Sequence, residues 1–333
     1  MAGDRSCEPM ERNGGDRRGT FACVRCLAVR RGYRSQLAGW MLLEGMQAGD
    51  HAQSSWFEEI RVVNERKGVC MTSTGPVVVR CGGGIAEIVI DRPETRNAIS
   101  TTVMDGLEEA IATVEESEVR VAVLRGAGNR VFVSGGDLKE LAEVRDFESA
   151  QAMAVRMRGI LDRLSRLPIP VVAALNGDAY GGGAEVALAC DVRIAADDVR
   201  MGFTHVNLGI MPAWGGVERL ASMIGPGRTL YLLATGTVIT GADLLSWGLA
   251  EEIVPRASFE ERWRALAHAL AEAPRDALVG IKALANATVP REHPQTADLA
   301  TTAFARTWVS DGHWEAVAKQ QERRRLAAAT QGT

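Results

Sequence analysis

Residues 176–185 have the sequence NGDAYGGGAE, and residues 131–139 have the sequence VFVSGGDLK. Each of these glycine-containing loops is expected to follow an apolar strand and to lead toward a helix. Because glycine has no Cβ, its backbone can approach a ligand closely and present a bare N–H group. Two N–H groups that converge on one oxygen form an oxyanion hole, which stabilises developing negative charge. In residues 176–185 the helix is expected to begin at the glycines, so that its dipole adds to the same field.

Outward from these loops, the hydrophobic pattern alternates between strands and helices. The expected strands are 77–80, 85–91, 119–124, 171–175, 192–195 and 201–203. Apolar residues recur at helical spacing in 101–116 and 147–167, and the prolines at 168 and 170 end the second of these helices. The alanine-rich sequence after residue 240 predicts further helices at 259–273, 277–287 and 298–308. Strands that alternate with helices predict an α/β fold.

Composition excludes several classes of protein. The chain has 333 residues, 46% of them hydrophobic, which is enough to bury a large core. Its formal net charge of −4 argues against nucleic acid as the main partner. No apolar run approaches the roughly 18 residues that span a bilayer, so no membrane partner is expected. Six scattered cysteines do not suggest a disulfide framework at this length, and a cytoplasmic location is predicted.

The first 70 residues differ from the rest. They are rich in arginine and show no sustained helical or strand periodicity. Cys23 and Cys26 form a lone C-x-x-C pair, which is weak evidence for a metal without a second pair or nearby histidines. Acidic residues such as Asp4 and Glu8 argue against a mitochondrial transit peptide. Residues 1–70 are therefore predicted to be a disordered extension, and no metal site is expected.

Four ordered blocks resemble the crotonase (enoyl-CoA hydratase/isomerase) superfamily, namely residues 90–99, 131–141, 171–191 and 207–216. The resemblance runs from about Met71 to near the C-terminus. It implies an acyl-CoA substrate and a spiral of ββα repeats in residues 71–255. It also implies a helical region in residues 256–333 for trimer contacts and for closing over the ligand. A homotrimer or a dimer of trimers is the implied assembly.

The resemblance assigns the two oxyanion N–H groups to Gly136 and Gly182. Together they would hold the thioester carbonyl oxygen of an acyl-CoA as it becomes an enolate. These glycines have an alternative explanation, because glycine also permits tight turns. The family's order and context of both loops favour the oxyanion hole.

Two further residues are candidates for proton transfer. Glu185 matches the first of two glutamates that hydratases use to position water, although a carboxylate near a helix N-terminus is also a common cap. The second glutamate position is occupied by His205. Histidine exchanges protons near pH 7, yet a lone histidine is often a packed structural residue. A hydratase with the two-glutamate scheme is expected to be badly impaired here.

The segment from Phe203 to Gly216 is similar to the ethylmalonyl-CoA decarboxylase branch of the superfamily. Loss of CO₂ from a 2-carboxyacyl-CoA leaves a thioester enolate directly, so no base is needed to create it. Such an enzyme must stabilise the enolate, desolvate the carboxylate and deliver one proton. Trp214 is a candidate for excluding water, and it has an ordinary packing explanation as well. His205 or Glu185 is the candidate proton donor.

The resemblance points to five residues for binding CoA, namely Arg96, Ala98, Asp137, Leu138 and Lys139. The two cations among them are candidates for the CoA phosphates, although surface cations are often only solvated. No cofactor is expected, because coenzyme A is part of the substrate.

The best interpretation is an acyl-CoA lyase that decarboxylates a malonyl-type CoA. Hydration or isomerisation of a 2-enoyl-CoA is the alternative within the family, and a non-catalytic acyl-CoA binder is the alternative of another class. A hydrolase using Ser134 and His205 is disfavoured, because no G-x-S-x-G elbow is present. A nicotinamide dehydrogenase is disfavoured because neither loop has the G-x-G-x-x-G pattern.

Overall fold

A computed structural model describes residues 62–64, 69–288 and 294–331 of the chain. The predictions made for residues 1–70, including the Cys23–Cys26 pair, fall outside the described residues except at 62–64 and 69–70. Val69–Thr74 forms a strand that pairs with Val77–Gly82, and the paired residues lie on both sides of Met71. The paired part of the chain therefore begins before Met71.

The larger sheet contains both antiparallel and parallel pairs. Its first four strands form an antiparallel meander, and the rest are parallel. Among the described residues its strands, in spatial order, are β1 (Val62–Asn64), β2 (Val69–Thr74), β3 (Val77–Gly82), β4 (Ile85–Ile90), β5 (Val121–Gly126), β7 (Val171–Leu175), β9 (Val192–Ala196) and β12 (Glu252–Val254).

The smaller sheet is built from very short strands. β6, β8 and β10 are parallel neighbours, and β11 pairs antiparallel with β10. Their bounds are β6 (Val131–Val133), β8 (Asp178–Tyr180), β10 (Arg200–Gly202) and β11 (Val238–Thr240). In three successive repeats, which end in α2 (Phe147–Arg166), α3 (Gly182–Leu188) and α4 (Gly216–Thr235), the chain places one strand in the large sheet, the next in the small sheet, and then forms a helix. This agrees with the spiral of ββα repeats that the family resemblance implies.

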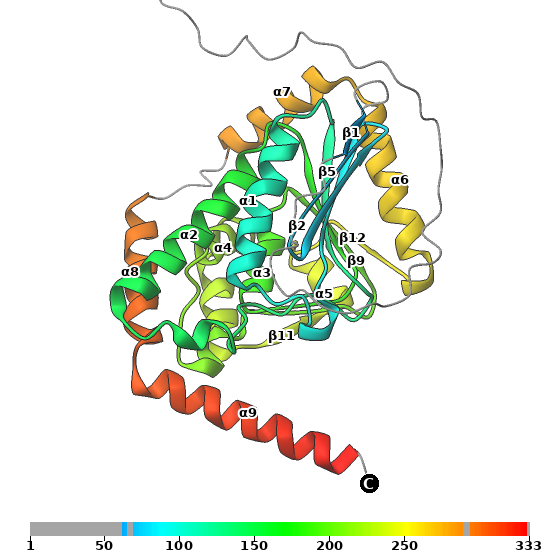
Figure 1. Cartoon of the computed structure of the whole chain (residues 1–333). Coiled ribbons are helices and arrows are strands. Elements are labelled where there is room, and N and C mark those ends of the chain that lie inside the picture. Colours follow the sequence, from blue (N-terminus) through cyan, green and yellow to red (C-terminus); the bar gives the residue numbers. More distant parts are fainter. Residues whose placement is uncertain (1–61, 65–68, 289–293, 332–333) are drawn as a thin grey trace, which may run out of the picture. The chain divides into compact units, whose positions relative to one another are not determined.

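Helices cover the large sheet on both faces. α1 contacts β2 and β3, whereas α6 contacts β4, β5 and β9 on the opposite side (Figure 1). The helix bounds are α1 (Thr101–Glu115), α2 (Phe147–Arg166), α3 (Gly182–Leu188), α4 (Gly216–Thr235), α5 (Gly241–Ser246), α6 (Phe259–Glu272), α7 (Arg275–Thr288), α8 (Pro294–Trp308) and α9 (Asp311–Gln331). Short 3₁₀ turns are η1 (Pro93–Thr95), η2 (Leu141–Glu143), η3 (Thr204–Leu208) and η4 (Arg256–Ser258).

The ends of the two long predicted helices have local causes. The Ser100 side chain accepts a hydrogen bond from Val103 N and caps α1, and Asp146 caps α2 by accepting from Ser149 N at 2.7 Å. The residue before a proline avoids the helical region, and α2 ends two residues before Pro168. α4 is kinked at Gly225, whose φ is +79°, immediately before Pro226.

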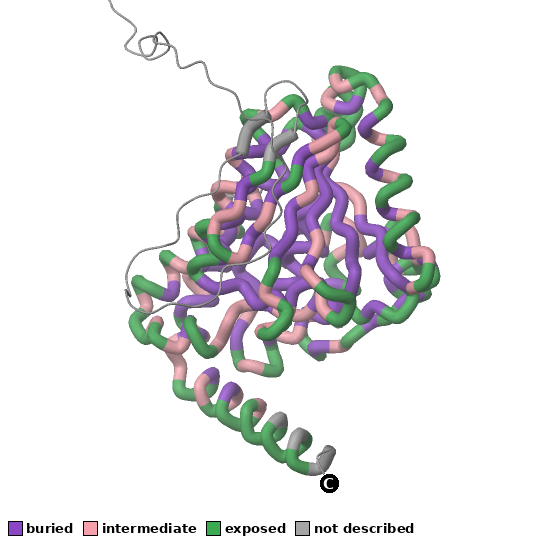
Figure 2. Tube along the Cα trace, turned by 45° about the vertical axis from the view of Figure 1, so that its right-hand side comes forward, coloured by how far each residue is buried: buried purple, intermediate pink, exposed green. Residues whose placement is uncertain are grey.

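The core lies between the large sheet and its helices. All five residues of β7 are buried, and α1 and α2 each turn one apolar face inward. Figure 2 shows the central strands in purple and most of α9 in green. Because β7 is covered on both faces, its sequence is a continuous apolar run rather than an alternating one.

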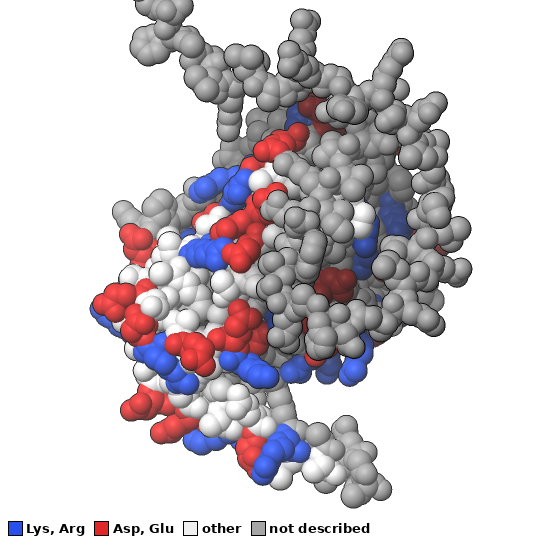
Figure 3. All heavy atoms as spheres, viewed as in Figure 1, with Lys and Arg blue, Asp and Glu red and all other residues white. Residues whose placement is uncertain are grey.

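Charged side chains of both signs share the surface of α1 and α2. Arg156 on α2 pairs with Asp105 and Glu108 on α1, and Arg163 pairs with Glu115. Figure 3 shows this intermingling of acidic and basic groups over the same face. Over the part of the chain that the structure describes, none of the helices is both long and apolar enough to cross a bilayer.

Candidate active site

Three neighbouring strands of the small sheet end at one edge. β6, β8 and β10 are parallel, so their carboxyl ends lie together. In open α/β sheets, ligands bind beyond the carboxyl ends of strands. The segments that follow these three strands hold the first glycine loop, the second glycine loop and His205. Sheet topology thus brings three motifs that are distant in sequence to one place.

The two glycine loops are in direct contact. Gly135 has a φ of +98°, and a Cβ placed on it would lie 3.4 Å from the Gly182 nitrogen. Gly136 pairs with Ile99 in an isolated bridge, whose hydrogen bonds are made by the Gly135 carbonyl and the Asp137 N–H. Within the described residues the Gly136 N–H therefore has no backbone acceptor. Gly182 is the first residue of α3, where N–H groups have no intrahelical partner. Within the part of the chain that the structure describes, neither N–H group donates to a backbone acceptor, so both can donate to an oxygen of a ligand.

The indole of Trp214 covers both glycines. A Cβ placed on Gly182 would lie 2.1 Å from Cζ3 of the ring, and one placed on Gly136 would lie 4.0 Å from Cη2. The Trp214 residue is 6% exposed. The ring therefore forms an apolar wall beside the two glycines. A side chain at residue 182 requires the ring to move.

Glu185 lies in the first turn of α3 and is 1% exposed. Its Oε1 accepts hydrogen bonds from Trp214 N and Gly216 N, each at 2.9 Å. A Cβ on Gly216 would lie 2.5 Å from Glu185 Cγ, so glycine at 216 is what admits the carboxylate. Hydrogen bonds between backbone N–H groups and a carboxylate are charge-assisted and strong. The loop 214–216 thus fixes the position of this carboxylate.

His205 completes the buried polar pair. Its Nε2 lies 3.1 Å from Glu185 Oε2, and the His205 residue is 7% exposed. A Cβ on Gly181 would lie 3.9 Å from the same Nε2, which places the imidazole beside the second glycine loop. The Nδ1 atom is buried and has no hydrogen-bond partner among the described residues. An imidazole that is oriented by a carboxylate in a pocket can transfer a proton.

The residues predicted to bind CoA fall into a clamp and a surface group. Asp137 Oδ2 pairs with Arg92 Nη2 at 3.0 Å, and Arg92 Nη1 donates to the Ala98 carbonyl at 3.0 Å. Arg92, which the sequence analysis did not single out, therefore ties the first loop to residues 96–98. Arg96 and Lys139 are exposed, and both line the same pocket.

One pocket of about 1060 Å³ joins these groups. Its walls include all ten candidates, namely Arg96, Ala98, Gly136, Asp137, Leu138, Lys139, Gly182, Glu185, His205 and Trp214. Its apolar part is contributed by Leu141, Met153 and Met211 together with the half-buried Leu138. This volume is slightly above the range of roughly 300–1,000 Å³ that is typical of small-molecule pockets.

The C-terminal helices contribute walls that the sequence analysis did not identify. Phe304 and Trp308 of α8 and Gln320 of α9 line the pocket. Trp308 Nε1 donates to the Val144 carbonyl at 2.9 Å, and its ring contacts His313 at the start of α9. The aromatic residues at 304 and 308 are at helical spacing, a pattern that signals packing but does not indicate what is packed. The helical C-terminal region is therefore present and borders the pocket.

Asn97 provides a test of how the first loop is held. The residue is 1% exposed, and its Nδ2 donates to the Ala127 and Val131 carbonyls at 3.0 and 2.8 Å. Its Oδ1 accepts from Arg92 N at 3.0 Å. Asn97→Ala is expected to lower the free energy of unfolding by about 3 kcal/mol, because it leaves buried backbone groups without partners. Urea unfolding measures this change.

The matched control for that measurement is Asn129→Ala. Asn129 is exposed, and its replacement is expected to change the free energy of unfolding by less than about 0.5 kcal/mol. Equal losses in the two variants would contradict the importance of the Asn97 hydrogen bonds.

Comparison with known proteins yields one consistent family. The family model described as "Enoyl-CoA hydratase/isomerase" matches residues 80–327. A solved structure of an enoyl-CoA hydratase/isomerase from Mycobacterium paratuberculosis superposes with a TM-score of 0.69 at 27% identity, covering 74% of this chain and 98% of that one. The fold and the sequence comparisons therefore agree.

Curated relatives share between a third and two fifths of their aligned residues with the chain. Enoyl-CoA hydratase domain-containing protein 2, mitochondrial, from Mus musculus is 39% identical over 51% of this chain and 58% of its own length. The short-chain-enoyl-CoA hydratase of Clostridium acetobutylicum is 36% identical over 54% of this chain and 68% of its own length. The ethylmalonyl-CoA decarboxylase of Xenopus tropicalis is 36% identical over 51% and 57%. The chain thus aligns with little more than half of the mouse and frog proteins.

Proposed function

We propose that this chain, which belongs to the enoyl-CoA hydratase/isomerase family, binds a 2-carboxyacyl-CoA and decarboxylates it through a thioester enolate. The names of the relatives support an acyl-CoA thioester as the substrate. The reaction within the family is the part that we infer from the site.

The pairing of Glu185 with His205 carries the proposal. Three other acidic residues line the pocket among those described, and none is placed like Glu185. Asp137 is paired with Arg92, Asp178 is paired with Arg200, and Glu94 is exposed. Activation of water by two carboxylates therefore lacks its second carboxylate beside the oxyanion loops.

The same residues suit decarboxylation. The bond between C2 and the carboxylate carbon breaks, CO₂ leaves, and the electron pair becomes the enolate of the thioester. The N–H groups of Gly136 and Gly182 stabilise the enolate oxygen. A proton from His205, or from Glu185, then adds to C2, and solvent restores it. The net reaction consumes one proton and releases one CO₂, and it needs no cofactor beyond the CoA of the substrate.

The apolar wall of Trp214 supports this chemistry physically. A carboxylate beside an indole ring loses water of hydration, and that loss favours the product state, in which the carboxylate has become neutral CO₂ and the negative charge has moved to the enolate oxygen.

Hydration of a 2-enoyl-CoA is the second candidate, and Glu185 itself favours it. The carboxylate lines the pocket beside the oxyanion glycines, where a single glutamate can orient a water. The hydratase from Clostridium acetobutylicum supports this alternative as directly as the decarboxylase from Xenopus tropicalis supports the first. A homotrimeric or hexameric assembly and a cytoplasmic location stay predictions, and the mouse relative is named as mitochondrial.

Mass spectrometry of the acyl-CoA pool distinguishes the candidates. The full chain is incubated separately with ethylmalonyl-CoA, methylmalonyl-CoA and crotonyl-CoA. Loss of the mass of one CO₂ from either malonyl-type substrate is the expected result. Gain of the mass of one water on crotonyl-CoA alone would contradict decarboxylation and assign hydration. Binding of these thioesters without turnover would instead indicate a non-catalytic binder.

A further inference from the structure

Two adjacent glycines separate two buried charges of opposite sign. Gly215 has a φ of +89°, and a Cβ placed on it would lie 2.4 Å from Arg219 Nη1. A Cβ on the next residue, Gly216, would lie 2.7 Å from Glu185 Oε1. The loop 214–216 therefore passes between a guanidinium and a carboxylate, and any side chain at either glycine would displace one of them.

The backbone of this loop alternates its polar groups between the two charges. The N–H groups of residues 214 and 216 donate to Glu185, as described above. The Trp214 carbonyl accepts from Arg219 Nη1 at 2.8 Å, and the Gly215 carbonyl accepts from Arg219 N at 3.3 Å. Arg219 thus holds the carbonyl side of the peptide segment whose N–H side holds Glu185.

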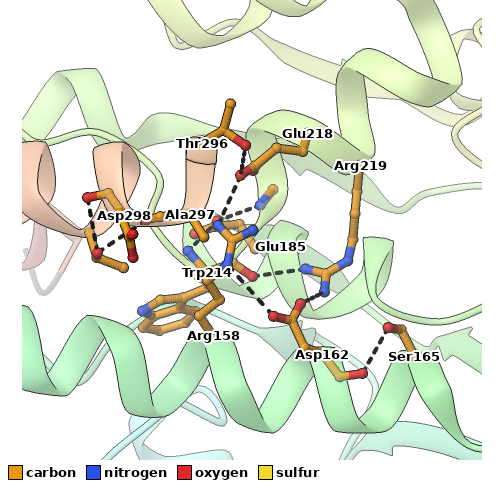
Figure 4. A network of polar contacts seen from close by, with 12 residues as sticks. Arg158, Asp162, Ser165, Glu185, Trp214, Glu218, Arg219, Thr296, Ala297 and Asp298 are labelled. Carbon is orange, nitrogen blue, oxygen red and sulfur yellow. Dashed lines mark hydrogen bonds and ion pairs between the residues drawn. The ribbon is translucent and has the colours of Figure 1, made fainter. Parts of the chain in front are cut away.

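Arg219 is itself fixed by a carboxylate on a different helix. Its Nη2 lies 2.5 Å from Asp162 Oδ1, and its side chain is 5% exposed (Figure 4). Burial lowers the pKa of Arg219, and the Asp162 carboxylate opposes that shift. A guanidinium stays protonated in proteins, so the cation has to be stabilised by its neighbours. The fork of nitrogens allows one side chain to bind Asp162 and the Trp214 carbonyl at once.

A second arginine extends the network to the C-terminal helices. Arg158 on α2 lies 3.6 Å from Asp162 Oδ2 and donates to Glu218 Oε1 at 2.9 Å. Thr296, near the start of α8, donates to the same Glu218 oxygen at 3.0 Å. Figure 4 shows these side chains bridging α2, α4 and α8. The two arginines of this network are thus paired with two carboxylates, those of Asp162 and Glu218.

We propose that Arg219 is a positioning residue for the oxyanion hole. By binding the Trp214 carbonyl it holds the Trp214 ring against Gly182 and keeps the two N–H groups directed at Glu185. Arg219 does not line the pocket, so it acts through the loop and not on the substrate. The proposal rests on the proposed function only in assigning the oxyanion hole to Gly136 and Gly182. It holds for decarboxylation and hydration alike.

The test compares Arg219→Met and Arg219→Lys with the wild-type full chain. The first readout is the absorbance of a bound aryl-acryloyl-CoA with an electron-donating ring substituent, which moves to longer wavelength when the thioester carbonyl is polarised. The second is kcat and KM on whichever thioester the wild-type protein converts. In both variants we expect the wavelength shift to fall by half or more. We also expect kcat to fall about 10- to 100-fold while KM changes by less than about threefold, because small misplacements near a reacting group are costly.

Arg193 provides the matched control. It is a buried arginine on β9 that donates to the Leu249 and Cys190 carbonyls and pairs with Glu251, and it does not line the pocket. Arg193→Lys is expected to lower the urea midpoint of unfolding without changing the wavelength shift of the bound probe. An equal loss of the shift in this control would overturn the proposal, because it would show a general effect of loosening the core.

The remaining outcomes are also decisive. If Arg219→Met does not fold, Arg219→Lys decides, since an ammonium cannot bind Asp162 and the Trp214 carbonyl with the geometry of the guanidinium fork. A folded Arg219 variant with the wild-type wavelength shift and kcat overturns the proposal. Absence of a shift in the wild-type protein overturns the oxyanion assignment and the proposal with it. A wild-type shift without CO₂ release contradicts only the proposed reaction.

Discussion

Replacing His205 with alanine is expected to lower the kcat for decarboxylation by about 10²–10⁴, the range that a positioned proton donor contributes. The imidazole Nε2 lies 3.1 Å from Glu185 Oε2 and beside the second glycine loop. Without it, the enolate would have to be protonated from Glu185 or from water. Acyl-CoA affinity is expected to change far less, because the oxyanion N–H groups and the Arg92 clamp stay in place. Release of CO₂ at saturating substrate measures kcat, and a fluorescent acyl-CoA displacement assay measures affinity.

The control for this experiment is His268→Ala. His268 is exposed on α6 and does not line the pocket. Its replacement is expected to leave kcat and affinity at the wild-type values. If His205→Ala also retains wild-type turnover while Glu185→Gln abolishes it, His205 is a packing residue and the proton comes from Glu185.

His205→Glu separates the two candidate reactions by a gain of activity. A glutamate at this position would face Glu185. It would restore the pair of glutamates that the resemblance to the family's hydratases implies. Hydration of crotonyl-CoA is expected to rise above the wild-type rate, while decarboxylation falls as in the alanine variant. A variant with unchanged hydration and unchanged decarboxylation would contradict a proton-transfer function at residue 205.

Long elements could be predicted from the sequence because each carries a complete local signal. The continuous apolar run at 171–175 corresponds to β7, whose five residues are all buried. Helix α2 was expected at 147–167 and spans Phe147–Arg166, with an aspartate cap before it and a proline after it. In both cases the burial and the ends of the element can be predicted from neighbouring residues, so no distant contact is needed.

Short and irregular elements escaped the sequence analysis for physical reasons. β8 has three residues, too few to show a period of two, and it lies inside what looked like a single glycine loop. α4 was missed because Gly225 and Pro226 interrupt it. Residues 256–333 were expected to be helical, but the bounds of α9 were not predicted, because its first turns bury only His313 and Val317 and it has no continuous apolar stripe. These helices are defined by what they pack against rather than by their own pattern.

The candidate site was predicted as far as its loops extend. All ten candidate residues line one pocket. Most of them lie in the segments that follow strands of the small sheet, and the others lie in stretches that contact those segments. The partners of those residues were not predictable. Asp162 and Arg219 are 57 residues apart on different helices, and the Arg92 clamp is one of many arginine–aspartate combinations that the sequence allows. Only the tertiary placement of these segments selects which charges meet.

Gly182→Ala is expected to lower kcat by about 10²–10³, the cost of losing one oxyanion donor. The added methyl group would lie 2.1 Å from Trp214 Cζ3, so the ring must move or the loop must shift away from the oxyanion position. Gly159→Ala is the matched control, because an added Cβ there meets nothing within 4 Å in the middle of α2. The control is expected to keep wild-type kcat and to gain slightly in stability through its higher helix propensity.

The double variant Gly182→Ala, Trp214→Ala identifies the cause of the loss. If the methyl group acts by colliding with the indole, removal of the ring should restore part of the activity lost in Gly182→Ala. The two changes would then be strongly non-additive, as expected for residues in direct contact. If the losses multiply independently, the alanine acts on the backbone of residue 182 and not on the ring. Wild-type turnover in Gly182→Ala itself would contradict the oxyanion assignment, because the ring and the methyl group cannot occupy the same space beside the N–H that the enolate requires.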